Sequence, residues 1–256
     1  MKPLTIRNVT LGEGRPKIIV PIVDHDAQAI LDRAAGFAGF PIDLVEWRAD
    51  FFSRVRDLQA VEQVLKGLRE RLPDRALLFT FRTRQEGGAR DISPEDYLAL
   101  NLCAAESGCA DLVDVEIFSV NAAESIRAIH AAGARVVGSN HAFDGTPPHS
   151  EILCRLRRAQ DMGADIPKIA VMPRSSRDVL TLLSATEEMF ANYADRPFLT
   201  ISMGGTGAVS RLAGEIFGSC ATFGAIGQSS APGQIPADEL ARVLDVIHRA
   251  NMPVTP

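Results

Sequence analysis

Cysteine is scarce in this chain, and its residues follow no metal-binding or redox pattern. The four are Cys103, Cys109, Cys154 and Cys220. They form no Cys-x-x-Cys pair and stand near no group of histidines, so the sequence does not indicate a zinc site or a dithiol site. We expect these thiols to be reduced and to pack as small apolar side chains.

Two further absences exclude other classes of protein. No block or stripe of Lys and Arg accompanies the net charge of −5, which argues against a nucleic-acid-binding protein. No apolar run approaches the roughly 20 residues that a membrane-spanning helix needs, and residues 1–5 contain no apolar leader segment. We therefore expect a cytoplasmic protein without nucleic-acid or membrane partners. A locally basic pocket for a small anionic metabolite remains compatible with this composition.

Eight short apolar segments, rich in Val, Ile, Leu and Phe, recur along the sequence. They are residues 17–23, 44–48, 76–82, 112–117, 135–140, 167–172, 198–203 and 221–226. Apolar runs of this length are typical of parallel strands that are covered on both faces.

The segments between these strands predict helices. Apolar residues three and four positions apart indicate one buried face in each of two helices. These faces consist of Leu58, Val61, Leu65, Leu68 and Leu72, and of Leu240, Val243, Leu244 and Ile247. Helix starts are indicated by Ser93 before Pro94, and by two pairs of a cap residue with an acidic residue at the third helical position. The two pairs are Asn121 with Glu124 and Ser175 with Asp178.

The order of these elements predicts the fold class. Strand starts lie 23 to 36 residues apart, which is the length of one strand–helix unit. Eight such units favour an α/β protein with a closed (β/α)8 barrel, formed by residues 1–256 as one domain, although an open doubly wound sheet has the same periodicity. No Gly-x-Gly-x-x-Gly follows the first strand, which argues against a dinucleotide-binding sheet. We expect residues 1–16 to form a short hairpin that closes the barrel floor.

Polar residues collect where the predicted strands end, and active sites of such barrels lie at the carboxyl ends of the strands. These residues are Glu46, Arg48, Arg82, Asp114, Glu116, His141 and Lys168, and Met203 ends the seventh strand. Side chains alternate faces along a strand, so Glu46, Arg48 and Asp50 share one face. Burying several charges is unfavourable unless they pair or hold a ligand, so either a site or an ion-pair network is indicated.

Lys168 stands in an apolar strand, where a solvated lysine is not expected. Desolvation and nearby cations lower a lysine pKa, which frees the amine to attack a carbonyl carbon. An ion pair with Glu46 or Glu116 explains the same strand context equally well. His141, just past a strand, has an ordinary pKa suited to proton transfer, and Glu86 is a candidate partner for its imidazole.

Taken together, these segments resemble the type I 3-dehydroquinate dehydratases along almost the whole chain. The first matching stretches are Gly12-Glu13-Gly14 with Pro16-Lys17-Ile18, Glu46-Trp47-Arg48, Phe79-Thr80-Phe81-Arg82-Thr83 with Glu86-Gly87-Gly88, and Ser139-Asn140-His141. The later ones are the run from Gly163 to Pro173 around Lys168, Ser210-Arg211-Leu212-Ala213-Gly214, and Ser230-Ala231-Pro232-Gly233-Gln234. Seven stretches in the family's order are a specific match.

The resemblance implies a barrel hydro-lyase that converts 3-dehydroquinate to 3-dehydroshikimate in the shikimate pathway. It implies an imine between the substrate ketone and Lys168, proton transfer by His141, and orientation of His141 by Glu86. The substrate-binding residues that we expect are Glu46, Trp47, Arg48, Arg82, Met203, Arg211, Ser230 and Gln234. Among these, Arg211 matches the family's carboxylate-binding arginine, and Ser230 and Gln234 match residues of a lid. The resemblance implies no metal, no soluble cofactor, and a homodimer.

Two positions depart from the family pattern, and two rival functions stay open. Ala142 follows the histidine where Asp is common, which puts the local hydrogen bonding in doubt, and Pro21 replaces a serine that contacts substrate in some members. A class I aldolase would need a phosphate cradle, for which Gly204-Gly205-Thr206-Gly207 is a candidate. A non-catalytic protein that binds a polyhydroxy acid is the second rival.

Overall fold

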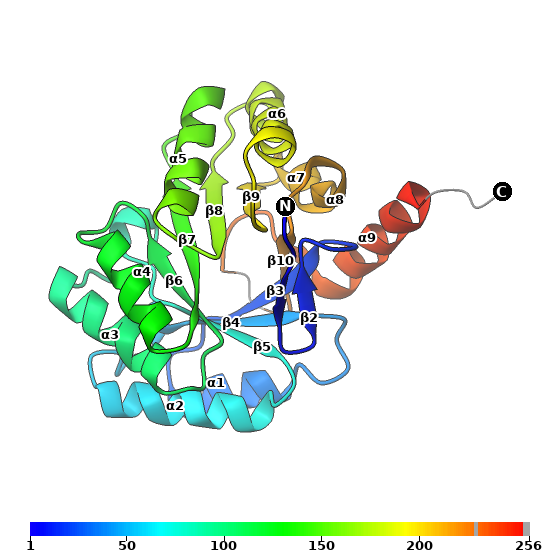
Figure 1. The fold of residues 1–256 in the computed structure, drawn as a ribbon. Coiled ribbons are helices and arrows are strands. Elements are labelled where there is room, and N and C mark those ends of the chain that lie inside the picture. The colour runs from blue at the N-terminus through cyan, green and yellow to red at the C-terminus, as the bar shows by residue number, and fades with distance from the viewer. Residues whose placement is uncertain (228–229, 253–256) are drawn as a thin grey trace.

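Eight parallel strands form the centre of the molecule in the computed structural model, which describes residues 1–227 and 230–252 (Figure 1). They are β3 (Lys17–Ile22), β4 (Leu44–Arg48), β5 (Ala76–Thr80), β6 (Leu112–Glu116), β7 (Arg135–Ala142), β8 (Ile166–Val171), β9 (Leu199–Ser202) and β10 (Ala221–Ala225). Each predicted strand is present, with ends that differ by up to two residues. A two-residue strand, β11 (Ile235–Pro236), pairs with the end of β10.

The sheet curls into a (β/α)8 barrel, as predicted. Neighbours along the chain pair in parallel from β3 to β9, and β10 returns to pair with β3. At the remaining seam, the backbone N–H of Cys220 donates to the carbonyl of Phe198 at 2.9 Å, which joins the start of β10 to that of β9.

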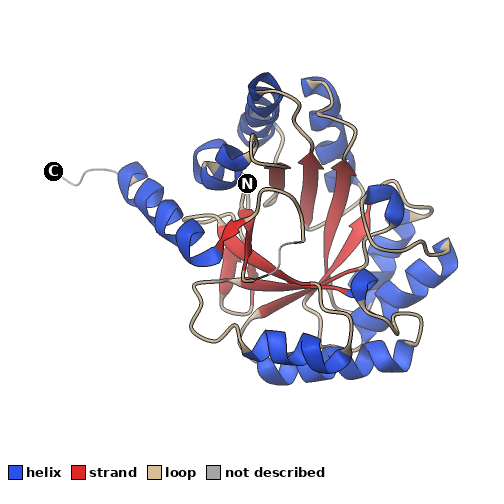
Figure 2. Ribbon diagram, turned by 180° about the vertical axis from the view of Figure 1, so that it is seen from behind, coloured by secondary structure: helices blue, strands red, loops and turns tan. Residues whose placement is uncertain are grey.

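Helices cover the outside of the strands (Figure 2). They are α1 (Ala27–Ala35), α2 (Leu58–Arg71), α3 (Pro94–Glu106), α4 (Ala122–Ala131), α5 (His149–Asp161), α6 (Ser176–Asn192), α7 (Ala208–Leu212), α8 (Gly214–Phe217) and α9 (Ala237–Asn251), with two 3-10 turns, η1 (Ala49–Phe51) and η2 (Arg84–Glu86). The predicted face of α2 is buried except at its first residue, Leu58, which is 41% exposed. In α9, Leu240 and Leu244 are buried, whereas Val243 is exposed.

The predicted helix starts are correct in two cases and partly wrong in the third. The Ser93 hydroxyl accepts from the N–H of Asp96, and Ser175 with Asp178 forms a reciprocal capping box. Asn121 occupies the cap position of α4, but its side chain accepts no bond from the described residues because its backbone is left-handed, with φ of 59°. Its carbonyl accepts from the first turn instead.

An N-terminal hairpin closes the barrel floor, as predicted. It consists of β1 (Leu4–Ile6) and β2 (Val9–Leu11), which pair antiparallel. Ile6, Val9 and Leu11 pack against the inward-facing residues at the amino ends of the strands, which include Ile19, Leu44, Leu78, Leu112 and Leu199. This apolar plug leaves the carboxyl ends as the open end of the barrel.

Two further findings concern membranes and cysteines. None of the helices within residues 1–227 and 230–252 combines the length and apolar character that crossing a membrane would require.

The four cysteines are free thiols. Cys220 is buried, whereas Cys154 is exposed, so packing as an apolar side chain does not describe all four.

Candidate active site

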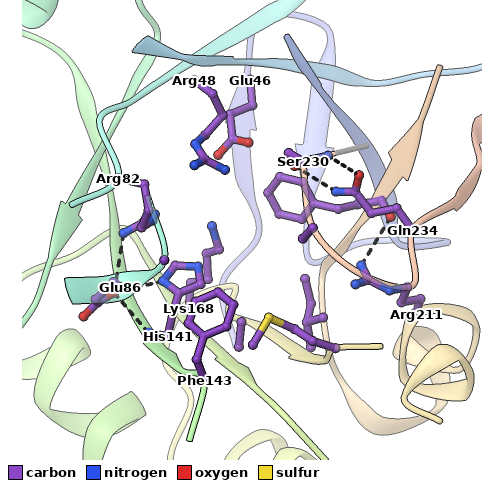
Figure 3. A pocket seen from close by; sticks show the side chains of 16 residues that line it. Glu46, Arg48, Arg82, Glu86, His141, Phe143, Lys168, Arg211, Ser230 and Gln234 are labelled. Atoms are coloured by element: carbon purple, nitrogen blue, oxygen red, sulfur yellow. Dashed lines mark hydrogen bonds and ion pairs between the residues drawn. The ribbon is translucent and has the colours of Figure 1, made fainter. Parts of the chain in front are cut away.

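A cavity opens at the carboxyl ends of the strands (Figure 3). Polar side chains from β4, β7 and β8, and from the segments that follow β5, β9 and β10, point into it. Ten of the eleven predicted site residues line it, namely Glu46, Arg48, Arg82, Glu86, His141, Lys168, Met203, Arg211, Ser230 and Gln234. Residues far apart in the sequence therefore meet in one pocket, as the strand-end positions predict.

Trp47 is the exception: its side chain does not line the cavity, so its placement lends no support to the predicted substrate contact. The indole is fully buried on the helix side of β4, packed against Phe52 and Phe79. Alternation along the strand explains this placement, because turning Glu46 and Arg48 into the barrel turns the residue between them outward.

Lys168 lies deep in the cavity, where its side chain is 5% exposed. Its Nζ is 3.6 Å from Oδ2 of Asp114 and 4.8 Å from the centre of the Phe223 ring. Asp114 is its one carboxylate partner within 4 Å among the described residues, rather than Glu46 or Glu116. Burial is the main effect that lowers the Lys168 pKa below its ordinary value. The charges of Asp114 and Glu46 oppose this shift, whereas those of Arg82 and Arg48 add to it. A low pKa favours the neutral, nucleophilic amine.

Arg82 organises the acidic groups next to Lys168. Its guanidinium contacts Asp114 at 2.8 Å and Glu116 at 3.0 Å, and it donates to the Ser139 hydroxyl at 2.9 Å. Ser139 in turn donates to Asp114 at 2.6 Å. The Arg82 charge is thus neutralised by protein carboxylates, which hold its pKa well above the ordinary value despite complete burial.

Arg48 is neutralised in the same way. Asp50 accepts two bonds from its guanidinium, each 2.8 Å long, and is itself fully buried. Asp50 also accepts from the backbone N–H of Ala89, which ties the loop that carries Glu86 to β4. Glu46 accepts from the Thr80 hydroxyl at 2.9 Å, so its carboxylate is oriented by the neighbouring strand.

Glu86 and His141 form a directly bonded pair. One Glu86 oxygen accepts from the His141 backbone N–H at 3.0 Å and lies 2.9 Å from Nδ1 of the imidazole. This bond leaves Nε2 available for proton transfer. Burial, with Arg82, Lys168 and Arg48, lowers the pKa of His141 well below its ordinary value, so the imidazole is a neutral base at neutral pH. Burial also raises the pKa of Glu86 to about 7, although Arg82 opposes this shift.

This pair leads to a prediction for Glu86→Gln. The variant keeps the size of the side chain but removes the carboxylate, whose charge stabilises a protonated imidazole. With a pKa raised to about 7, above that of His141, the protonation of Glu86 sets the acid limb of the wild-type rate profile. We expect a moderate loss of kcat, smaller than that of removing His141, and an acid limb of the pH–rate profile that moves to lower pH. Steady-state rates from acid to alkaline pH would measure this shift. An unmoved profile would reduce Glu86 to a loop carboxylate without influence on His141.

Arg211, on α7, differs from the other cations of the pocket. It is 1% exposed and has no carboxylate within ion-pair distance among the described residues. Its two terminal nitrogens donate to the carbonyls of Phe223 and Pro232 at 3.4 and 3.1 Å, and its Nε has no partner in the described part of the chain. Burial lowers its pKa to about 10, so it is still charged at neutral pH. The alternative pairing with Glu215 is not present, because Glu215 contacts His248 instead.

The loop after β10 lies over this arginine. Ser230 and Gln234 bond each other twice, at 2.9 and 3.0 Å, and both line the cavity (Figure 3). The N–H of Gly204 donates to the Pro232 carbonyl at 3.1 Å. Gly233 has φ of +76°, and a Cβ there would lie 2.3 Å from the Gly204 carbonyl, so this close approach requires glycine. Ser229, the first residue of the predicted lid, lies outside the described residues.

Sequence reasoning assigned no role to one group of site residues and missed another. Asp50, Asp114 and Glu116, singled out at strand ends, and Ser139 and Asn140, in a family stretch, support the lining side chains. Phe143 and Phe223 form an apolar wall of the cavity. No signal in the sequence indicated either ring. Phe143 stacks on His141 with ring centroids 6.4 Å apart. Gly87 makes room for this ring, because a Cβ there would lie 2.3 Å from it.

Comparisons with known proteins agree with this geometry. The sequence model of the family described as type I 3-dehydroquinase matches residues 18–251. The 3-dehydroquinate dehydratases of Shigella boydii serotype 4 (strain Sb227) and Escherichia coli (strain 55989 / EAEC) are each 47% identical over 252 residues, covering 98% of this chain and 100% of each relative.

Two solved structures are similar over nearly the same length. The type I 3-dehydroquinate dehydratase from Clostridium difficile, with covalently modified comenic acid, has a TM-score of 0.94 at 47% identity, covering 97% of this chain and 99% of that one. The 3-dehydroquinate dehydratase from Geobacillus kaustophilus HTA426 has a TM-score of 0.95 at 40% identity, covering 98% of both chains. This chain therefore belongs to the type I 3-dehydroquinase family.

Proposed function

We propose that this chain is a hydro-lyase that dehydrates 3-dehydroquinate to 3-dehydroshikimate through an imine on Lys168. The observation that carries the proposal is a buried lysine with a lowered pKa in the same cavity as a neutral histidine, which is held by a carboxylate. A nucleophilic amine and an oriented base are the two groups that elimination beside a ketone needs.

The chemistry divides between Lys168 and His141. The neutral Lys168 amine attacks the ketone carbon, and one water leaves as the protonated imine forms. His141 takes a proton from the adjacent carbon, and the imine accepts the electron pair as an enamine. The hydroxyl one carbon further on then leaves with the proton that His141 returns, which gives a second water and a conjugated imine. Hydrolysis uses one water to free the product and Lys168, so one water is released overall.

Glu86 and Asp114 prepare these two groups. Glu86 accepts from the Nδ1–H tautomer of His141 and stabilises the imidazolium that forms during proton transfer. Asp114 lies on one side of Lys168 and is itself paired with Arg82, so its charge is shared between the two cations. Arg48 and Arg82 are both neutralised by protein carboxylates and present N–H donors to the hydroxyl groups of the ring.

Arg211 binds the substrate carboxylate. Among the described residues that line the pocket, it is the cation without a carboxylate partner. A planar guanidinium can donate two parallel bonds to a carboxylate, and burial strengthens such a pair. Ser230 and Gln234 bond each other above the pocket, and we expect them to exchange these bonds for substrate when the loop closes.

Arg211→Ala is therefore expected to weaken substrate binding more than it slows the chemical step. A charge-assisted bond contributes about 1.5–3 kcal/mol, which corresponds to a rise in KM of roughly 10- to 100-fold. Arg211→Lys is the matched control, because it keeps the charge but loses the planar fork, and its KM should fall between those of the wild type and R211A. Steady-state kinetics give both constants. An unchanged KM in R211A would remove Arg211 from the substrate site.

The activity itself has a direct assay. Incubation with 3-dehydroquinate should produce the ultraviolet absorbance of a conjugated enone, which neither an aldolase nor a non-catalytic binding protein would generate. The aldolase alternative also lacks support at its candidate phosphate loop. There, the Gly204 and Gly207 N–H groups donate to the carbonyls of Pro232 and Gly204 and are not free to bind phosphate. No absorbance change with folded protein would overturn the proposal.

A homodimer and a cytoplasmic location remain predictions. Sedimentation of the purified protein would test the first, and cell fractionation the second.

A further inference from the structure

We propose that Arg155, on the outer helix α5, is a positioning residue of this active site. It fixes the side-chain amide of Asn140, and through that amide the orientation of Glu86 against His141. The inference rests on the proposed function and extends it to a side chain outside the pocket. Ser139 and His141 point into the barrel, whereas Asn140, between them on β7, points outward and is 6% exposed. This direction brings its amide within reach of α5.

The bonds on the Asn140 amide admit one orientation. Nη1 of Arg155 donates to Oδ1 of Asn140 at 2.9 Å, and Nδ2 of Asn140 donates to Oε1 of Glu86 at 3.0 Å. A guanidinium has only donors, and an ionised carboxylate has only acceptors. A turned amide would place its oxygen against the carboxylate and its NH₂ against the guanidinium, so both bonds would be lost. Arg155 therefore selects the rotamer that donates to Glu86.

Arg155 is itself held in place, as a positioning role requires. Its Nε donates to Glu151 at 2.8 Å, one helical turn earlier, and its guanidinium lies 5.6 Å from the centre of the Phe118 ring. The side chain is 23% exposed, so most of it is enclosed between α5 and the end of β7. With two anchors on its fork, Arg155 presents Nη1 to Asn140 in a fixed direction.

The Asn140 bond adjusts the protonation of Glu86. Charged and titratable groups from the neighbouring strands and the segments after them face this carboxylate, namely Arg82 after β5, Asp114 and Glu116 from β6, and His141 from β7. Burial and the two acids raise the Glu86 pKa, whereas Arg82 and the Asn140 bond lower it. Loss of a correctly turned amide leaves Glu86 easier to protonate, and a protonated Glu86 no longer stabilises the His141 imidazolium.

The test is Arg155→Met, which keeps the apolar stem and removes the donors. We expect kcat to fall by about 2- to 10-fold, the factor that one intramolecular hydrogen bond supplies, with KM nearly unchanged. The acid limb of the pH–rate profile should move to higher pH, opposite to the shift expected for E86Q. Arg155→Lys retains a donor for Asn140 and should restore part of the rate. A wild-type profile in R155M would overturn the inference.

Arg158 provides a matched control on the same helix. Its guanidinium lies 4.8 Å from the centre of the same Phe118 ring, but it has no bond to Asn140. Arg158→Met should leave kcat and the pH profile unchanged. The same shift in R158M and R155M would attribute the effect to α5 packing and would contradict the proposal.

A second variant covers the case in which R155M fails to fold. Asn140→Asp keeps the acceptor for Arg155 but turns an acceptor toward Glu86, so the acid limb should again move to higher pH. An unmoved limb in N140D would overturn the inference. Failure of the proposed function is distinguishable from this outcome, because the wild-type protein would then produce no enone absorbance. Borohydride trapping on Lys168 should persist in both variants.

Discussion

Lys168→Ala is expected to abolish both turnover and covalent trapping of substrate. The lysine supplies the electron sink of the reaction, and no other lysine lines the cavity among the described residues. Borohydride added during turnover reduces the imine and leaves substrate or product on the protein. Mass spectrometry of intact wild-type protein should detect the added mass, and K168A should show none. The loss reflects missing chemistry rather than weaker binding, so a higher substrate concentration should not restore the rate.

Two controls separate the nucleophile from its charge and from other lysines. Lys168→Arg keeps a cation near Asp114 but provides no neutral amine, so it should fold and bind anions yet remain inactive. Lys66→Ala removes an exposed lysine that pairs with Glu62, and it should trap and turn over as the wild type does. Peptide mapping that places the label on Lys2, Lys17 or Lys66 would contradict the mechanism.

His141→Ala is expected to slow turnover by about 100- to 10,000-fold while leaving imine formation possible. The imidazole moves the proton between carbon and the leaving hydroxyl, and no other histidine lines the cavity among the described residues. Lys168 pairs with Asp114 and His141 bonds Glu86, so the attack of Lys168 on the ketone should survive the loss of the imidazole. The adduct should therefore accumulate, and borohydride should label a larger fraction of H141A than of the wild type at steady state.

A half-buried histidine that does not line the cavity provides the comparison. His149, at the start of α5, has a side chain that is 35% exposed, and its Nε2 lies 3.4 Å from Glu188. It therefore pairs with a different carboxylate from the one that bonds His141. H149A should retain the wild-type rate and the wild-type extent of labelling. Near-full turnover in H141A would remove the histidine from its assigned role.

The sequence predicted the barrel because the signals for it are local. A buried parallel strand is apolar over its whole length, so β8 was recognised to within one residue from its composition. Strand ends were less accurate, since the ladder of bonds between neighbours decides where a strand stops. The strand predicted at 76–82 ends at Thr80, whereas the one predicted at 135–140 continues to Ala142.

The sequence also determined which residues meet in the site, because parallel strands bring their carboxyl ends to one edge of a barrel. Lys168, His141 and Glu86 were singled out by their positions and by resemblance. The same alternation that placed Glu46 and Arg48 in the barrel already indicated the outward direction of Trp47, and this signal was available but unused.

Only the tertiary structure decided which side chains bond to one another. Lys168 lies beside Asp114, Arg82 joins Asp114 to Glu116, and Arg211 is left with carbonyl partners. The connection from Arg155 through Asn140 to Glu86 has no counterpart in the sequence pattern. Partners such as these belong to different strands and helices, and their distances depend on strand register and on how each helix packs against the barrel. Local periodicity fixes the face on which a side chain lies, but closing the barrel determines what that face meets.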